Sequence, residues 1–121
     1  MTTIQALGLT LLTATAAAAP RAAGQPDPVV TDGDKYKVVL ENERVRVLEY
    51  RDSPGQRTSP HYHPDYVLCS LSAFRRRFVM PGGQEVVRDV PSGQVAWGKA
   101  QSHVGENVGS TETHVLVIEL K

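Results

Sequence analysis

The sequence lacks several features that would place it in a common class of proteins. It contains one cysteine, Cys69, so an intramolecular disulfide is excluded, which is compatible with either the cytosol or a bacterial periplasm. Its 13 basic residues balance its 13 acidic residues, and this balance gives no indication of nucleic acid or an anionic membrane surface as a partner. No stretch carries apolar residues at helical spacing over three turns, so a helical bundle is not expected.

One uncharged run, residues 4–19, lies near the N-terminus. It is shorter than the ~20 apolar residues that cross a bilayer, so we expect no stable membrane span. The run ends in small residues, and Ala16 and Ala18 provide the A-x-A pattern of a signal-peptide cleavage site. Because no basic residue precedes Arg21, a disordered alanine-rich tail is the alternative. We therefore expect residues 1–23 to be a signal peptide or a disordered N-terminus, and the protein to be periplasmic or secreted.

The remaining sequence is typical of a turn-rich β protein. Residues 24–34 combine proline, glycine and aspartate and predict a flexible lead-in. Beyond them, short segments of β-branched and apolar residues alternate with turn signals, and they predict strands over residues 35–40, 44–51, 66–71, 74–80, 84–90, 95–97 and 112–120. Short strands at this density favour a closed barrel or a sandwich, so we predict one all-β domain over residues 35–121.

The histidines carry the most evident chemistry. His61 and His63 are separated by one residue, so in an extended segment their side chains point to the same side. His103 follows a Pro-Ser-Gly turn at residues 91–93 and a short strand. A chain that turns in this way can place a third imidazole, on a neighbouring strand, beside the first two. Neutral imidazoles suit divalent transition metals, and the pattern predicts a site for one ion of Fe, Zn, Ni, Mn or Cu.

These residues resemble the two sequence motifs of the cupin superfamily. The matching residues are Gly55, His61 and His63 for the first motif, and the turn at 91–93, His103 and Asn107 for the second. The resemblance covers residues 35–121. It implies a small single-domain cupin, whose fold is an antiparallel β-barrel of the double-stranded β-helix (jelly-roll) type. It further implies a metal held by the three histidines, a small molecule inside the barrel and a homodimer.

The chain departs from the cupin pattern at the glutamate that usually completes the metal site, because the matching positions, residues 66–68, hold no carboxylate. Asp65 and Tyr66 lie near enough to replace it. His114 is a third candidate, since alternation along the segment 112–120 puts it on the predicted inward face. Each of the three is predicted to be a fourth ligand or a hydrogen-bond partner of a ligand. Three histidines with an open coordination position are the alternative.

Four residues are candidates for roles beside the metal. Glu106 lies next to Asn107 and is a candidate general base, with an exposed loop glutamate as the alternative. Arg46 and Arg76 lie in predicted strands and are candidates to bind a substrate carboxylate, with arginines along a solvated sheet edge as the alternative. Asn107 is assigned to the same substrate-binding role.

Two functional hypotheses follow from these residues. The first is a metalloenzyme that acts on a small, acidic organic molecule, through oxidation by a three-histidine Fe(II) centre or through metal-assisted isomerisation or hydrolysis. The second is a non-catalytic periplasmic protein that captures a small molecule or a metal. A metal-free barrel used as a subunit interface ranks last, because it requires the histidine pattern to be a coincidence.

Overall fold

The computed structural model describes residues 25–121, and the expected signal peptide therefore lies outside the described residues. Its elements are one short helix, α1 (Pro28–Thr31), and nine strands: β1 (Tyr36–Glu41), β2 (Val45–Asp52), β3 (His61–His63), β4 (Tyr66–Ser70), β5 (Phe74–Val79), β6 (Glu85–Val90), β7 (Val95–Gly98), β8 (Gln101–Asn107) and β9 (Thr113–Leu120). The described residues contain no helix that is long and apolar enough to cross a membrane. The all-β prediction is confirmed.

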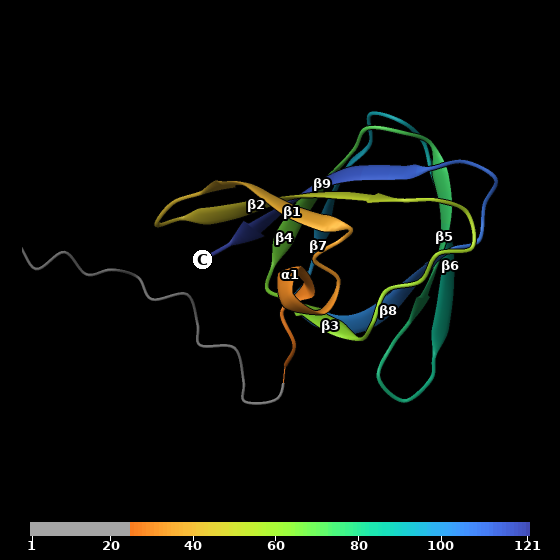
Figure 1. The fold of residues 1–121 in the computed structure, drawn as a ribbon, viewed down its shortest axis with the longest axis horizontal. Coiled ribbons are helices and arrows are strands. Elements are labelled where there is room, and N and C mark those ends of the chain that lie inside the picture. Colours follow the sequence, from red (N-terminus) through yellow and green to blue (C-terminus); the bar gives the residue numbers. More distant parts are fainter. Residues whose placement is uncertain (1–24) are drawn as a thin grey trace, which may run out of the picture.

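The strands form two antiparallel sheets that face each other around a common interior (Figure 1). The five-stranded sheet has the order β1-β2-β9-β4-β7, and the four-stranded sheet has the order β3-β8-β5-β6. Strand β8 was not predicted, because its sequence shows no clear alternation and resembles a loop. It pairs with β3 and with β5, and thereby carries His103 into the four-stranded sheet.

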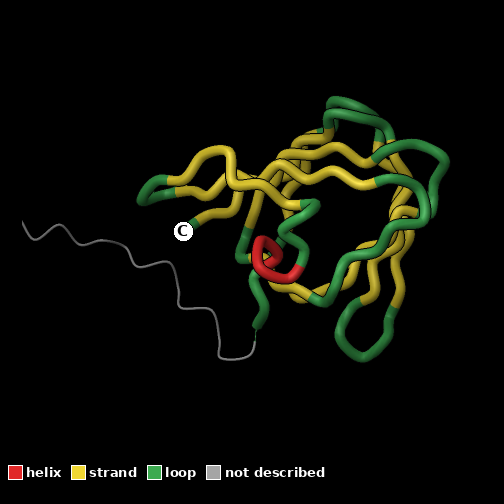
Figure 2. The backbone as a smooth tube through the Cα atoms, in the orientation of Figure 1, coloured by secondary structure: helices red, strands yellow, loops and turns green. Residues whose placement is uncertain are grey.

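Tight turns join the short strands (Figure 2). The β5–β6 hairpin turns at Gly82 and Gly83, whose φ angles are 91° and 90°. Side chains with a Cβ rarely adopt this left-handed region, so the two glycines make the sharp reversal possible at this point.

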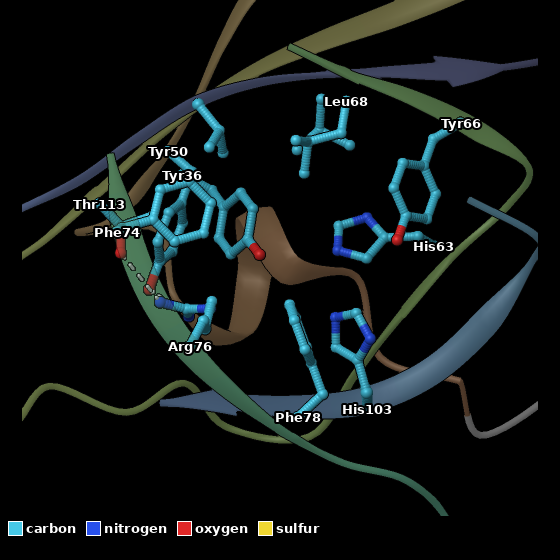
Figure 3. A pocket seen from close by; sticks show the side chains of 12 residues that line it. Tyr36, Tyr50, His63, Tyr66, Leu68, Phe74, Arg76, Phe78, His103 and Thr113 are labelled. Carbon is cyan, nitrogen blue, oxygen red and sulfur yellow. Dashed lines mark hydrogen bonds between the residues drawn. The ribbon is translucent and has the colours of Figure 1, made fainter. Parts of the chain in front are cut away.

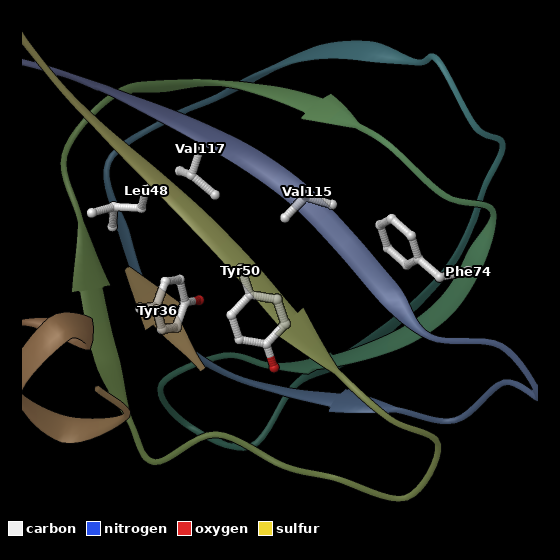
Figure 4. Packing of buried hydrophobic residues seen from close by; sticks show 6 residues of the cluster. All are labelled: Tyr36, Leu48, Tyr50, Phe74, Val115 and Val117. Atoms are coloured by element: carbon white, nitrogen blue, oxygen red, sulfur yellow. The ribbon is translucent and has the colours of Figure 1, made fainter. Parts of the chain in front are cut away.

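The hydrophobic core lies between the sheets and is built mainly from the five-stranded one (Figure 4). Its buried members are Tyr36, Leu48, Tyr50, Phe74, Val115 and Val117. On β9 the inward face consists of Thr113, Val115, Val117 and Glu119, all buried. Because side chains alternate along a strand, His114 lies on the outer face. The prediction that His114 points inward is therefore wrong.

The physical reason is that both faces of β9 carry apolar residues. On the outer face, Leu116 and Ile118 lie opposite residues of β4 and β2 such as Val47 and Cys69, so this side of the sheet is also apolar. Alternation reveals that a segment is a strand, but with apolar residues on both faces it does not reveal which face is buried.

Residues 25–34 are packed against the barrel, so the predicted flexible lead-in is corrected for this part of the chain. Asp27 caps α1 by accepting a hydrogen bond from the Val29 amide, and Pro28 is buried. The helix contacts β1 and β3, and Asp32 accepts a hydrogen bond from the Ser59 amide. Composition favoured a flexible segment because the contacts that order it come from distant strands.

A buried ionic cluster lies at one end of the core. The Arg76 guanidinium donates to Asp52 at 2.6 Å and to the Tyr50 hydroxyl at 2.8 Å, and the Asn107 amide donates to the second Asp52 oxygen at 3.0 Å. Gly105 lies beside this guanidinium, where a Cβ would approach its nitrogens to 2.7 Å. Asp52 thus neutralises the charge of Arg76, and the lack of a side chain at Gly105 leaves room for the guanidinium.

Replacing Asp52 tests this cluster. Asp52→Ala leaves the buried Arg76 guanidinium without its carboxylate, and we expect the free energy of unfolding to fall by about 3–5 kcal/mol. The control is Glu112→Ala, which breaks the exposed pair with Arg51 at 3.2 Å. We expect this control to cost less than about 1 kcal/mol. Denaturant unfolding of both variants measures the difference, and equal losses would contradict the analysis.

Candidate metal centre

Three histidines meet at one end of the barrel interior. His61 and His63 lie two residues apart on β3, and the β3–β8 register places His103 directly opposite His61. All three are buried, with exposed fractions of 1%, 3% and 6%. One potential ligand atom from each ring lies within 4.8 Å of the other two. The three imidazoles predicted from the sequence to share a site therefore do so.

The hydrogen bonds of the three rings define which nitrogen is available. Each Nδ1 lies next to an oxygen that accepts: His61 with the Ser59 carbonyl at 2.9 Å, His63 with Glu119 Oε2 at 2.8 Å, and His103 with Gln101 Oε1 at 2.9 Å. A carbonyl or carboxylate oxygen only accepts, so each Nδ1 carries the hydrogen and each neutral ring keeps a lone pair on Nε2. The cluster thus offers three lone pairs of the kind that divalent transition metals bind.

Burial keeps the rings of His61 and His103 neutral. It lowers the pKa of His61 to about 4 and that of His103 to about 2, and in both cases the neighbouring His63 adds to the effect. Protons therefore do not compete for the nitrogens of His61 and His103 near neutral pH. The donor set fits a borderline divalent metal ion.

Glu119 supports the cluster from β9. Burial by itself would raise the pKa of this carboxyl, but the His63 hydrogen bond and the Arg46 guanidinium outweigh burial and lower it. One carboxylate oxygen accepts from His63, and the other accepts from Arg46 at 2.7 Å. Glu119 is thus ionised and orients His63 through its Nδ1 hydrogen.

Sequence reasoning missed Glu119 because it assigned the opposite face of β9 to the interior. The sequence does contain one signal for Glu119. Counted in steps of two along β9, Glu119 shares a face with the apolar residues Val115 and Val117. A carboxylate does lie beside the histidines, but it contacts the ring nitrogen that points away from the shared site.

The cluster borders a small cavity of about 50 Å³ between the sheets. Figure 3 shows His63 and His103 on one side of this cavity and Arg76 on the other. Tyr36 also lines it, and its hydroxyl lies 3.3 Å from Nε2 of His61. No Asp or Glu is among the described residues that line the cavity.

Comparison with known proteins agrees with this architecture. Neither the protein-family models nor the curated proteins give a match. Among solved structures, the chain is similar to a cupin domain from Bordetella pertussis Tohama I, with 28% identity over 80% of this chain and 96% of that one and a TM-score of 0.66. The chain is a small protein of the cupin superfamily.

Two further structures share the cupin fold. A double-stranded β-helix protein from Klebsiella pneumoniae is 24% identical, over 81% of this chain and 79% of that one, with a TM-score of 0.55. A polyketide cyclase from Streptomyces resistomycificus is 19% identical, over 70% of this chain and 63% of that one, with a TM-score of 0.54. At these identities the likeness establishes the fold alone.

Of the three residues predicted to assist the metal, two lie away from the histidines and one lies beside them. His114 contacts Glu49 at 3.1 Å on the outer face of the five-stranded sheet. Asp65 is exposed and accepts a hydrogen bond from the Ala100 amide. Tyr66 does line the cavity, with its ring 5.4 Å from the His63 ring. Burial raises the pKa of Tyr66, so its side chain is a neutral phenol.

Glu106 does not face the cavity, which corrects its assignment as a general base. It pairs with Arg77 at 3.3 Å on the outer side of the four-stranded sheet. His103 and Asn107 occupy the inner side of the same strand, because residues an odd number apart on a strand point in opposite directions. The sequence analysis treated this segment as a loop and therefore had no basis for assigning faces.

The arginines predicted to bind substrate are both neutralised by the protein itself. Arg46 lies between Glu119 and Asp27, with distances of 2.8 and 3.0 Å to the two Asp27 oxygens. Arg76 pairs with Asp52, and Asn107 donates to the same carboxylate. The three side chains stabilise the barrel. Because their polar groups are already paired within the protein, the prediction that they bind substrate is corrected.

The lowered pKa values give a testable dependence of stability on pH. As the pH of metal-free protein falls from about 6.5 to about 5, unfolded histidines take up protons near their ordinary pKa, whereas folded His61 and His103 do not. The unfolded state binds more protons, so we expect the free energy of unfolding to fall over this range. Denaturant titrations at several pH values measure the slope.

Two variants identify the source of this slope. His103→Gln and His61→Gln each remove one of the two groups, and each should make the slope shallower than in the wild type. Equal slopes in both variants and the wild type would show that the buried histidines do not cause the dependence.

Proposed function

We propose that this cupin binds one divalent transition metal ion through Nε2 of His61, His63 and His103 and accepts a small organic acid beside it. The observation that supports this proposal is the set of three Nδ1 hydrogens, each held by an acceptor, which leaves three lone pairs within 4.8 Å of one another. Imidazole nitrogens suit Fe, Zn, Ni, Mn or Cu.

Three protein ligands leave open coordination positions, as in catalytic sites. When bound, such an ion supplies Lewis acidity or, in the case of iron, a centre for oxidation, so oxidation, isomerisation and hydrolysis are the reaction classes proposed. The protein adds the hydroxyl of Tyr36 beside the site. Burial raises the pKa of Tyr36, so this hydroxyl stays protonated and donates to Nε2 of His61 in the metal-free protein, a hydrogen bond that a metal ion on Nε2 would replace.

A non-catalytic binding protein is the second candidate function. It is favoured by the lack of any Asp or Glu among the described residues lining the inner cavity, which leaves no carboxylate there to act as a base. In this case the protein captures a metal or a small molecule. The uncharged run at residues 4–19 supports a periplasmic or secreted location for either function.

We further propose that the protein is a homodimer that packs through the outer face of the five-stranded sheet. On this face Trp97 lies opposite Val67, and Val67 lies opposite Ile118. Trp97 and Val95 are 58% and 66% exposed, respectively. Contiguous exposed apolar residues of this kind mark interaction surfaces.

The metal proposal predicts about one equivalent of a transition metal in protein purified without chelator or histidine tag. Elemental analysis measures this, and the metal identified decides between oxidation and Lewis-acid chemistry. Adding that metal to the stripped protein should raise the melting temperature, because the ion binds the folded state. Both effects should be lost in His61→Ala and retained in His114→Ala. Failure to bind any of several divalent ions after reconstitution would refute the proposal.

A milder pair of variants keeps all three ligands in place. Glu119→Gln removes the charge that orients His63, and we expect metal affinity to fall by about 10- to 100-fold. Glu49→Gln makes the same change beside His114 on the outer face and should leave the affinity unaltered. Calorimetric titration with the identified metal distinguishes the two.

The dimer proposal predicts that the wild-type protein sediments as a dimer and that Trp97→Lys shifts it towards a monomer. A charge introduced on an apolar interface must be desolvated there without a partner. Val87→Lys is the control, because Val87 is also exposed, at 45%, but lies on the other sheet. A wild-type monomer at micromolar concentration would contradict the proposal.

A further inference from the structure

The open side of the barrel, between the edge strands β6 and β7, forms a cleft of about 520 Å³. The opposite edges, β1 and β3, are contacted by α1 (Figure 1). The cleft and the histidine cavity share four lining residues: Tyr66, Leu68, Phe74 and Phe78. A molecule in the cleft therefore reaches the walls of the metal centre's own cavity.

Arg88 lies on the inner wall of this cleft. In the β5–β6 register, Arg88 lies directly opposite Arg76, and the neighbouring pairs on the same face are Phe78 with Val86 and Phe74 with Val90. Because the β5 members of these pairs line the cavity, Arg88 shares the inner face with them. It also lines the cleft.

The two facing arginines differ in how their charges are balanced. Arg76 is neutralised by Asp52 at 2.6 Å. Arg88 has no hydrogen-bond or ion-pair partner in residues 25–121. Its positive charge acts on the phenol of Tyr66, where it opposes the rise in pKa that burial causes. An uncompensated positive charge thus lies near the junction of the cleft and the metal cavity.

The remaining walls of the cleft indicate what binds there. They are largely apolar or aromatic, with Phe74, Phe78, Met80, Val86, Val90 and Ala96 among the lining residues. Lys99 adds a second positive charge, and no Asp or Glu is among the described lining residues. Apolar walls of low dielectric constant strengthen the attraction of such cations for an anion.

Gly98 shapes the junction between the cleft and the cavity. It lies opposite Tyr66 in the β4–β7 pair, and a Cβ at this position would collide with the Tyr66 ring. The missing side chain allows the ring to lie across β7, where it forms part of the wall of both spaces. The aromatic surface of Tyr66 therefore faces a ligand in the cleft.

We propose that this cleft binds a small aromatic or apolar molecule with one carboxylate or sulfonate group, and that the acid group pairs with Arg88. The apolar body lies between β6 and β7, with its far end towards His63 and His103. This inference names the class of ligand for the proposed function and the residue that recognises it. It rests on the proposed function only in placing a metal ion at the inner end of the ligand. The role assigned from sequence to Arg46 and Arg76 thus belongs to Arg88.

The test uses a matched pair of fluorescent probes, the anion 8-anilinonaphthalene-1-sulfonate and its uncharged analogue N-phenyl-1-naphthylamine. Arg88→Gln should weaken binding of the anion by about three- to tenfold, the range for one solvent-accessible charged contact. It should leave binding of the uncharged analogue unchanged. Added salt should weaken anion binding to the wild type more than to Arg88→Gln.

The control is Arg75→Gln, which removes the same charge from the outer face of β5, where Arg75 lies 3.9 Å from Asp89. It should leave anion binding unchanged. Equal weakening in both variants would show an effect of net charge alone, and unchanged binding in Arg88→Gln would show that the probe binds elsewhere. Either result, or no anion binding by the wild type, overturns the inference.

Metal content, measured on the same preparations, separates this inference from the proposed function. Normal metal loading together with Arg88-independent anion binding would overturn the cleft assignment and leave the metal centre standing. Arg88-dependent anion binding in a protein that binds no metal would establish the cleft and refute the metal centre.

Discussion

The buried carboxylate of Glu119 connects the histidine cluster to the N-terminal segment. One oxygen accepts the Nδ1 hydrogen of His63, and the other accepts from Arg46. Arg46 in turn binds Asp27, which caps α1. A buried carboxylate is stable only when its charge is compensated, so this arrangement ties β9, β2, β3 and the N-terminal segment to one another. The orientation of His63 in the candidate metal centre and the attachment of α1 thus depend on the same group.

Three arginines on the inner faces of the two sheets differ in how their charges are balanced. Arg46 and Arg76 each have a carboxylate partner, and both side chains are largely buried. Arg88 lies at the edge of the four-stranded sheet, where solvent stabilises an unpaired charge at lower cost. This difference separates arginines that hold the barrel together from one that remains available to a ligand. The type of residue is the same in all three cases, and only the neighbours differ.

The shape of the sandwich explains where the histidine cavity borders an open cleft. The edges β1 and β3 are contacted by α1, whereas β6 and β7 are separated by the cleft. Strands at sheet edges can leave a gap between two packed layers, and in this protein such a gap shares wall residues with the cavity beside His63 and His103. Glycines at positions 98 and 105 provide the space for Tyr66 and Arg76 at the ends of the cavity.

Much of the fold and part of the candidate site follow from sequence alone. Strands β1, β2, β4 to β7 and β9 are visible because β-branched residues alternate between strong turn signals. His61 and His63 converge for a local reason, since two residues separated by one in an extended chain share a side. His103 was found through its place after the Pro-Ser-Gly turn, although its strand, β8, was not recognised.

What only the tertiary structure decided is the choice of face and the choice of partner. Strand β9 is apolar on both sides, so its alternation did not show that Glu119 points inward and His114 outward. The ionic partners of Arg46 and Arg76 come from strands distant in the sequence, and no local pattern reveals that these charges are neutralised while that of Arg88 is not. Local spacing determines which side chains lie together on one strand, whereas burial and charge compensation depend on how the strands are brought together.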